Sequence, residues 1–203
     1  MDPAVIANRV TSLAATVNRP LMLGISGFGG AGKSTLAQAL LELMPGSQVV
    51  PGDQFLLSRP PTARSDDWAS VDRERLRTQV MLPIRRGQAP HYQVYDWAAG
   101  ALGGWLAVTG SPVIVEGLGL FHPDIVGHFD LRVWIDVDLD TATSWGMERD
   151  KTVYDNPQTQ LWEEVWKPND ADFFRRFRPD RAADVWYVPG GEAPPPRDVP
   201  STP

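Results

Sequence analysis

The chain has 203 residues, no cysteine, and 25 acidic against 19 basic side chains, which gives a formal net charge of −6. This length suits one domain with a sizeable core. The lack of cysteine excludes disulfides and thiolate metal sites, and the acidic balance argues against a nucleic-acid partner. Because no apolar run approaches the ~20 residues that cross a bilayer and the N-terminal residues lack the pattern of a secretory signal, we expect a cytoplasmic protein without a membrane partner.

The N-terminal half is predicted to begin with an amphipathic helix and then to alternate strands with helices. Apolar residues at helical spacing indicate a helix over 4–17, and a short apolar run indicates a buried strand over 21–26. The elements expected next are a helix over 34–44 ended by Pro45 and Gly46, a strand over 48–50, an exposed loop over 59–67, and a helix over 71–84 that Pro83 disturbs.

The C-terminal half continues the same alternation. Apolar runs predict strands over 112–117, 131–137 and 184–188, and the pattern over 140–178 is mainly helical, with breaks at Pro157 and Pro168. From residue 189 to residue 203 the chain is rich in Pro, Gly and polar residues, so we expect a disordered tail.

The alternation of strands and helices predicts parallel βαβ units. We therefore expect an α/β protein of three layers, with a mostly parallel sheet flanked by helices, in a single domain over residues 1–188.

Residues 27–34 carry the pattern G-x-x-x-x-G-K-[ST] between a predicted strand and a predicted helix, which is the setting that a P-loop requires. Glycines let successive backbone N–H groups curl around phosphate oxygens, and the helix N-terminus adds partial positive charge. Lys33 would reach the β- and γ-phosphates, and the Ser34 hydroxyl would bind Mg²⁺. The residues predicted to bind the nucleotide are Gly27, Phe28, Gly29, Gly30, Ala31, Gly32, Lys33, Ser34 and Thr35.

Two acidic residues follow predicted strands. Asp53 comes directly after the strand over 48–50, and Glu116 lies at the end of the strand over 112–117. The carboxyl ends of parallel strands meet at one edge of the sheet, where α/β proteins bind ligands. A carboxylate there can hold Mg²⁺ or accept a proton from an attacking hydroxyl.

The order of the motifs resembles the uridine kinase branch of P-loop kinases, which is related to phosphoribulokinase, pantothenate kinase and nicotinamide riboside kinase. The resemblance runs over residues 21–188 and rests on the segments GISGFGGAGKST (24–35), VVPGDQF (49–55), VYDW (94–97), VIVEGLGLF (113–121), VDLDTATSWGMERD (137–150), VWKP (165–168) and AADV (182–185).

The resemblance implies a P-loop NTPase fold with a short helical lid over about 142–154, and an enzyme that uses ATP and Mg²⁺ to phosphorylate a hydroxyl of a small molecule. It implies that Asp53 is the catalytic base, that Lys33 and Arg149 act on the transferred phosphoryl group, and that Ser34 and Glu116 hold the metal. It also places Tyr95 in the acceptor pocket, and Asp67 falls where the family has a ribose-binding aspartate. Trp97 is a further candidate substrate contact, because it lies next to the acceptor segment and its ring could stack on a flat substrate.

The resemblance favours a nucleoside as the acceptor. However, residues 98–103 (AAGALG) lack the histidine and arginine of uridine kinases, and a site without such partners loses discrimination for uridine. Nicotinamide riboside, pantothenate and a sugar acid stay open as acceptors, as do a non-catalytic nucleotide-binding switch, the choice between ATP and GTP, and a homo-oligomeric state.

Overall fold

The computed structural model describes residues 1–57, 62–96 and 98–190. The predicted substrate contact Trp97 lies outside the described residues, as do the first residues of the predicted loop (59–61). Of the predicted tail, Pro189 and Gly190 form a turn, and 191–203 lie outside the described residues.

A five-stranded parallel sheet forms the centre of the molecule, with strand order β2-β5-β1-β6-β7. The strands are β1 (Met22–Ser26), β2 (Gln48–Pro51), β5 (Val113–Glu116), β6 (Leu131–Ile135) and β7 (Val185–Tyr187). Each coincides with a strand predicted from the sequence, with ends that differ by at most two residues, so the parallel α/β architecture is confirmed.

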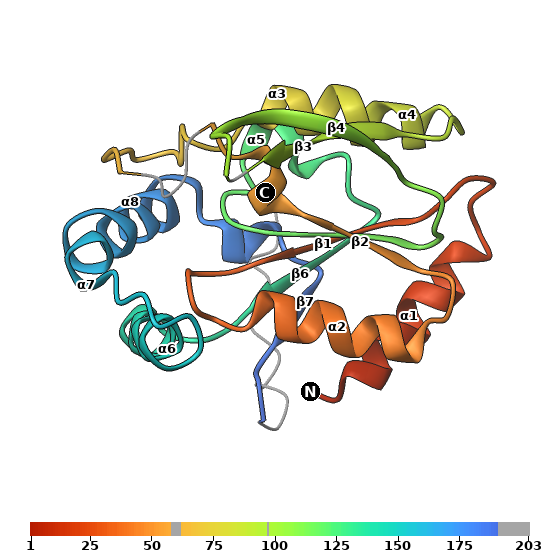
Figure 1. The fold of residues 1–203 in the computed structure, drawn as a ribbon. Helices are drawn as coiled ribbons and strands as arrows, with labels where there is room; N and C mark the ends of the chain where they lie inside the picture. The colour runs from red at the N-terminus through yellow and green to blue at the C-terminus, as the bar shows by residue number, and fades with distance from the viewer. Residues whose placement is uncertain (58–61, 97, 191–203) are drawn as a thin grey trace.

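Helices cover both faces of this sheet and its ligand-binding end (Figure 1). In that view α1 (Pro3–Ala14) and α2 (Lys33–Leu43) lie below the sheet, and α3 (Arg73–Leu76), α4 (Leu82–Arg85) and α5 (Pro123–Val126) lie above it. The helices α6 (Leu139–Thr152), α7 (Thr159–Leu161) and α8 (Lys167–Phe177) gather at one side. Among the helices of the described residues, none combines the length and the apolar character needed to cross a membrane.

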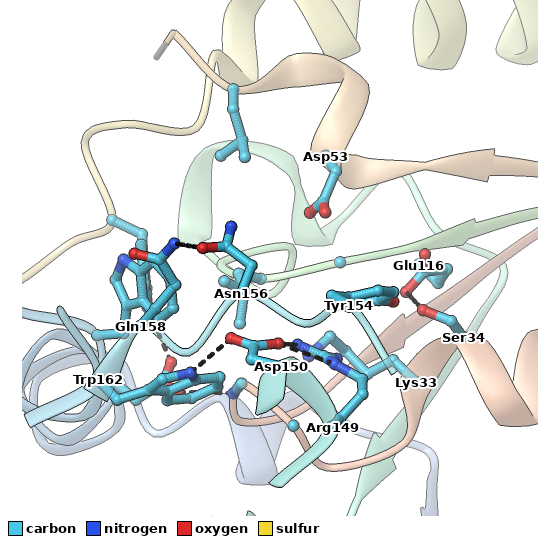
Figure 2. A pocket seen from close by; sticks show the side chains of 18 residues that line it. Lys33, Ser34, Asp53, Glu116, Arg149, Asp150, Tyr154, Asn156, Gln158 and Trp162 are labelled. Atoms are coloured by element: carbon cyan, nitrogen blue, oxygen red, sulfur yellow. Dashed lines mark hydrogen bonds and ion pairs between the residues drawn. The ribbon is translucent and has the colours of Figure 1, made fainter. Parts of the chain in front are cut away.

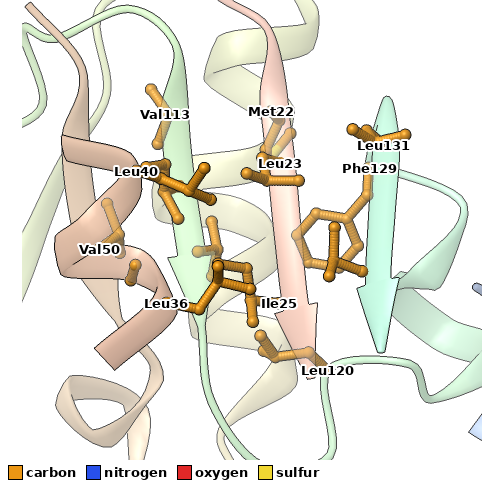
Figure 3. Close-up of a cluster of buried hydrophobic side chains, with 14 of the residues drawn as sticks. Met22, Leu23, Ile25, Leu36, Leu40, Val50, Val113, Leu120, Phe129 and Leu131 are labelled. Atoms are coloured by element: carbon orange, nitrogen blue, oxygen red, sulfur yellow. The ribbon is translucent and has the colours of Figure 1, made fainter. Parts of the chain in front are cut away.

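The apolar face of α2 is the main contact of the lower layer with the sheet. Leu36 and Leu40 are buried against strand residues that include Val50 and Val113 (Figure 3). This spacing of four residues places both leucines on the same side of the helix. Packing of α2 on the sheet therefore fixes the position of its N-terminus, which begins at Lys33.

Two predicted helix breaks are wrong. Pro83 lies in α4 and Pro168 lies in α8, and each is preceded by a π-helical segment, Arg77–Met81 and Trp162–Trp166 respectively. The wider π-helical turns continue directly into the proline-containing helices. The chain therefore stays helical although proline has no N–H to donate. The predicted break at Pro157 is confirmed, since this residue lies between α6 and α7.

An antiparallel hairpin was not predicted. It consists of β3 (His91–Asp96) and β4 (Ala101–Ala107), and its pairing shifts register between Gln93 and Tyr95. The sequence signal is weak because Gly103 and Gly104 lie within β4, and glycine disfavours strands. The hairpin packs over Phe55, whose ring lies 5.3 Å from that of Tyr92.

Gly24 provides a test of the core. A Cβ atom at this position of β1 would lie 2.8 Å from the ring of Phe129, which is itself buried. We expect Gly24→Ala to lower the free energy of unfolding by about 1–3 kcal/mol because the core is overpacked, as measured by urea denaturation. Gly104→Ala is the matched control, since a Cβ atom at Gly104 has no neighbour within 4 Å. An equal loss in both variants would contradict this account of the core.

Candidate active site

The P-loop has the backbone conformation that a phosphate site needs. Gly30 and Gly32 have φ angles of +79° and +94°, in the left-handed region that glycine tolerates, and Gly32 is the N-cap of α2. Successive backbone N–H groups in such a turn can form an anion-binding concavity. This arrangement agrees with the phosphate site predicted for residues 27–35.

Lys33 is the buried cation of this loop. Its Nζ donates hydrogen bonds to the carbonyl oxygens of Gly27 (3.3 Å) and Phe28 (2.8 Å). Burial lowers the pKa of Lys33, and the nearby carboxylates of Glu116, Asp170 and Asp53 act in the opposite direction. The ammonium group is thus held beside the P-loop and surrounded by negative charge.

The carboxyl ends of β2, β5 and β1 bring the predicted acidic residues together. Glu116 pairs in register with Pro51 of β2 and Ile25 of β1, and Asp53 follows in the 3₁₀ helix η1 (Gly52–Phe55). A Cβ atom at Gly52 would lie 2.8 Å from the Glu116 carbonyl oxygen, so the strand ends approach closely. In Figure 2 the carboxylates of Asp53 and Glu116 lie around the same cavity.

Ser34 and Glu116 fit a magnesium site. The Ser34 hydroxyl donates a hydrogen bond of 3.2 Å to Oε2 of Glu116, so one hydroxyl and one carboxylate converge at the mouth of the P-loop. Desolvation raises the pKa of Glu116, while the charge of Lys33 lowers it. A cation at this place would relieve the cost of the half-buried charge. Mg²⁺ usually takes one or two protein oxygens and completes its octahedron with water and phosphate, so this pair is sufficient.

The predicted lid, residues 142–154, covers α6 from its fourth residue and the first two residues after the helix. The guanidinium group of Arg149 pairs with Asp150 at 2.8 Å and lies 5.3 Å from the ring centre of Tyr154. Both residues line the cavity beside Lys33. Figure 2 shows Arg149 and Lys33 close together at the cavity.

Trp162 packs α6 against the P-loop. A Cβ atom at Gly146 of α6 would lie 2.4 Å from its ring, and one at Gly29 would lie 3.0 Å from it. The indole Nε1 donates a hydrogen bond of 2.8 Å to Asp150. The P-loop and α6 also touch directly, because a Cβ atom at Gly30 would lie 2.1 Å from the Ala142 carbonyl oxygen.

Asp170 is a buried carboxylate at the P-loop that sequence reasoning missed. It is 4% exposed, and its two oxygens accept hydrogen bonds from the Gly29 amide (2.7 Å) and from Nε1 of Trp68 (3.0 Å). Desolvation raises its pKa to about 6, although both hydrogen bonds and Lys33 oppose this shift.

The cavity has a volume of about 390 Å³. Several of its lining residues were not among the predicted site residues; they come from separate segments and meet only in the folded chain. They are Leu56, Trp68, Leu118, Asp150, Tyr154, Asn156, Gln158, Trp162, Trp166 and Asp170. Leu118, Asp150 and Trp166 lie in segments that carry the family resemblance, and the high content of eight tryptophans is a further signal.

Two predicted substrate contacts are not brought to this cavity. Tyr95 lies on β3 and does not line it. Asp67 does not line it either, because its carboxylate accepts hydrogen bonds from the Ser65 hydroxyl (2.6 Å) and from Arg73 (3.3 Å). The Asp67 contacts hold the loop before α3, and its contact with a substrate stays a prediction.

Known proteins share both sequence and fold with the chain. It is 25% identical over 199 residues to a pantothenate kinase from Streptococcus mutans, a match that covers 83% of this chain and 61% of that protein. It is 27% identical over 120 residues to uridine-cytidine kinase C from Dictyostelium discoideum, covering 57% of this chain and 26% of that protein. The chain therefore spans less than two thirds of these relatives. No protein-family model matches the sequence.

A solved structure shows the same fold. A possible uridine kinase from Bacillus stearothermophilus superposes with a TM-score of 0.65 at 18% identity, covering 90% of this chain and 99% of that one. The chain is thus similar to P-loop kinases of the uridine kinase and pantothenate kinase type, as the motif order indicated.

Burial of Asp170 predicts a specific pH dependence of stability. Its pKa is about 6 in the folded chain and near 3.8 when it is unperturbed, so between these values the folded state binds a proton that the unfolded state has lost. The stability that this group contributes is present at low pH and falls as pH rises through 6. Relative to wild type, we expect Asp170→Asn to gain about 2–3 kcal/mol between pH 4 and pH 7, as measured by urea denaturation at each pH.

Asp172→Asn is the control on the same helix. Hydrogen bonding to Arg64 holds the pKa of Asp172 below its usual value, so the stability it contributes appears as pH rises and is lost as pH falls. Because this contribution is lost only as pH falls below the ordinary pKa of 3.8, the stability difference between Asp172→Asn and wild type should stay nearly constant between pH 4 and pH 7. A difference between Asp170→Asn and wild type that stays constant with pH would contradict the prediction.

Proposed function

We propose that this uridine kinase-like P-loop chain is a kinase that transfers the γ-phosphoryl group of ATP to a hydroxyl of a small molecule. The observation that carries the proposal is the convergence of four groups at the ends of neighbouring parallel strands: Lys33, the Ser34–Glu116 pair and Asp53. A phosphate cradle, a metal-binding pair and a separate carboxylate together supply what phosphoryl transfer requires.

In this proposal the P-loop residues 27–35 hold the triphosphate, and Lys33 neutralises its terminal charge. Magnesium bound by Ser34 and Glu116 would offset the negative charge that develops on the phosphoryl oxygens. Arg149 lines the same cavity from α6, so its guanidinium group can add a second positive charge at the transferred group. Residues 142–154 would act as the lid that excludes water from the reaction.

Asp53 is proposed as the base for the acceptor hydroxyl. It lies on η1, across the cavity from Lys33 (Figure 2), and Glu116 is already engaged with Ser34. A carboxylate at this place can accept the hydroxyl proton and hold the oxygen in line with the phosphoryl group.

A nucleoside is the favoured acceptor. The cavity wall carries the partly exposed ring of Trp166 and the exposed ring of Tyr154, together with the side-chain amides of Asn156 and Gln158. Such a wall can stack on a planar base and exchange hydrogen bonds with its edge. Pantothenate is the second candidate, supported by the name of the Streptococcus mutans relative.

An acceptor screen tests this proposal. With ATP and Mg²⁺ and panels of nucleosides, vitamins and sugar acids, we expect at least one acceptor to be phosphorylated with kcat/KM in the ordinary range of about 10⁴–10⁸ M⁻¹s⁻¹. Lys33→Ala is the control, and it should lose ATP affinity in calorimetry because the charge at the phosphates is gone. Equal ATP affinity in wild type and Lys33→Ala would refute the assigned phosphate site.

Asp53→Asn separates the roles of the two carboxylates. The change keeps the shape of the side chain but removes its basicity, so we expect kcat to fall by about 10²–10⁴-fold while ATP affinity stays near the wild-type value. Steady-state kinetics with the best acceptor, together with calorimetry, measure the two effects. A preserved kcat with a collapse of nucleotide affinity would instead assign Asp53 to the metal.

A further inference from the structure

Asp170 lies within the P-loop site but has no role in the proposed chemistry. Its carboxylate joins two distant parts of the chain, since Gly29 belongs to the P-loop and Trp68 belongs to the loop before α3. Both donors and the acceptor line the cavity. Asp170 is 4% exposed. Burial of a carboxylate costs folding free energy unless hydrogen bonds or ion pairs compensate for the lost hydration.

We propose that Asp170 is a positioning residue that couples Trp68 to the P-loop, so that nucleotide affinity depends on how Trp68 is held. This inference rests on the proposed nucleotide site. One carboxylate oxygen orients the Phe28–Gly29 peptide, one residue before Gly30, where the P-loop turns into its left-handed conformation. The other oxygen fixes the indole of Trp68. A shift of either partner therefore moves the acceptor of the other.

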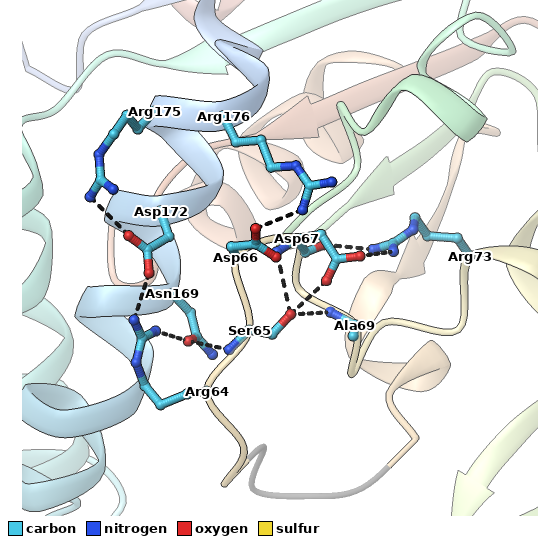
Figure 4. Close-up of polar contacts among 10 residues, drawn as sticks. All are labelled: Arg64, Ser65, Asp66, Asp67, Ala69, Arg73, Asn169, Asp172, Arg175 and Arg176. Carbon is cyan, nitrogen blue, oxygen red and sulfur yellow. Dashed lines mark hydrogen bonds and ion pairs between the residues drawn. The ribbon is translucent and has the colours of Figure 1, made fainter.

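The loop that carries Trp68 is held to the helix that carries Asp170 (Figure 4). The Ser65 amide donates a hydrogen bond of 2.8 Å to Asn169, and Arg176 pairs with Asp66 at 2.7 Å. Arg64 reaches the same helix through Asn169 and Asp172. Loop and helix thus form one unit, and Asp170 supplies a hydrogen bond from this unit to the P-loop.

The chemistry of the carboxylate makes the coupling specific. An ionised Asp170 offers two acceptor oxygens to two N–H donors, whereas an asparagine in its place has one acceptor oxygen and an amino group. In Asp170→Asn, either the Gly29 amide or the Trp68 indole N–H therefore faces the side-chain NH₂ group, which is also a donor. Trp68→Phe removes the indole donor and keeps an aromatic ring in a site that is 1% exposed.

A double-mutant cycle on Mg²⁺–ATP affinity tests the coupling. We expect Trp68→Phe and Asp170→Asn each to weaken binding by about three- to tenfold in calorimetry, and the double variant to bind no more weakly than Asp170→Asn alone. The matched control is Trp186→Phe, because the buried Nε1 of Trp186 has no hydrogen-bond partner among the described residues. Its ATP affinity should equal that of wild type.

Each outcome decides the inference. If the loss of affinity in the double variant equals the product of the losses in the two single variants, Trp68 and Asp170 act separately and the coupling is overturned. Unchanged affinity in Trp68→Phe would overturn it as well. Thermal unfolding identifies variants that do not fold, and if Asp170→Asn is one of them, the comparison of Trp68→Phe with Trp186→Phe decides. A wild-type protein that does not bind Mg²⁺–ATP overturns the nucleotide site and the coupling with it, whereas binding without coupling leaves the proposed function intact.

Discussion

The candidate site depends on the placement of β5 between β2 and β1 in a parallel sheet. This pairing brings the P-loop after β1, Asp53 after β2 and Glu116 at the end of β5 to one edge. A shift in register would separate the Ser34–Glu116 pair, since a strand residue advances by about 3.3 Å. The close contact of Gly52 with the Glu116 carbonyl oxygen shows how little space the backbone leaves for such a shift.

The parts of the fold that follow from local pattern were predictable. Short apolar runs between breakers predict all five strands of the main sheet, and the glycine spacing before Lys33 predicts a loop whose backbone requires glycine. The hairpin over 91–107 was missed because glycines interrupt its strand pattern. Trp162 and Asp170 were missed for another reason. They lie in the π-helical segment before α8 and in α8 itself, and these elements meet the P-loop only through tertiary packing, which no spacing in the sequence encodes.

The charge distribution explains why the site suits a nucleotide that carries magnesium. Lys33 is buried among three carboxylates, those of Glu116, Asp170 and Asp53, so the region is negative before any phosphate arrives. A bare triphosphate would add to this repulsion, whereas a divalent cation between Ser34 and Glu116 offsets it. The proposed function and the acidic lining are therefore consistent only when the metal enters with the nucleotide.

The contact between Gly30 and α6 restricts how the proposed lid can open. Because Ala142 and Gly146 lie against the P-loop backbone, and Trp162 fills the space between Gly146 and Gly29, the first half of the helix cannot swing without dragging the P-loop along. The hinge of any opening motion must then lie after Gly146, which leaves a short arm carrying Arg149 and Tyr154. The proposed lid would then be limited to this arm, whose two side chains line the cavity.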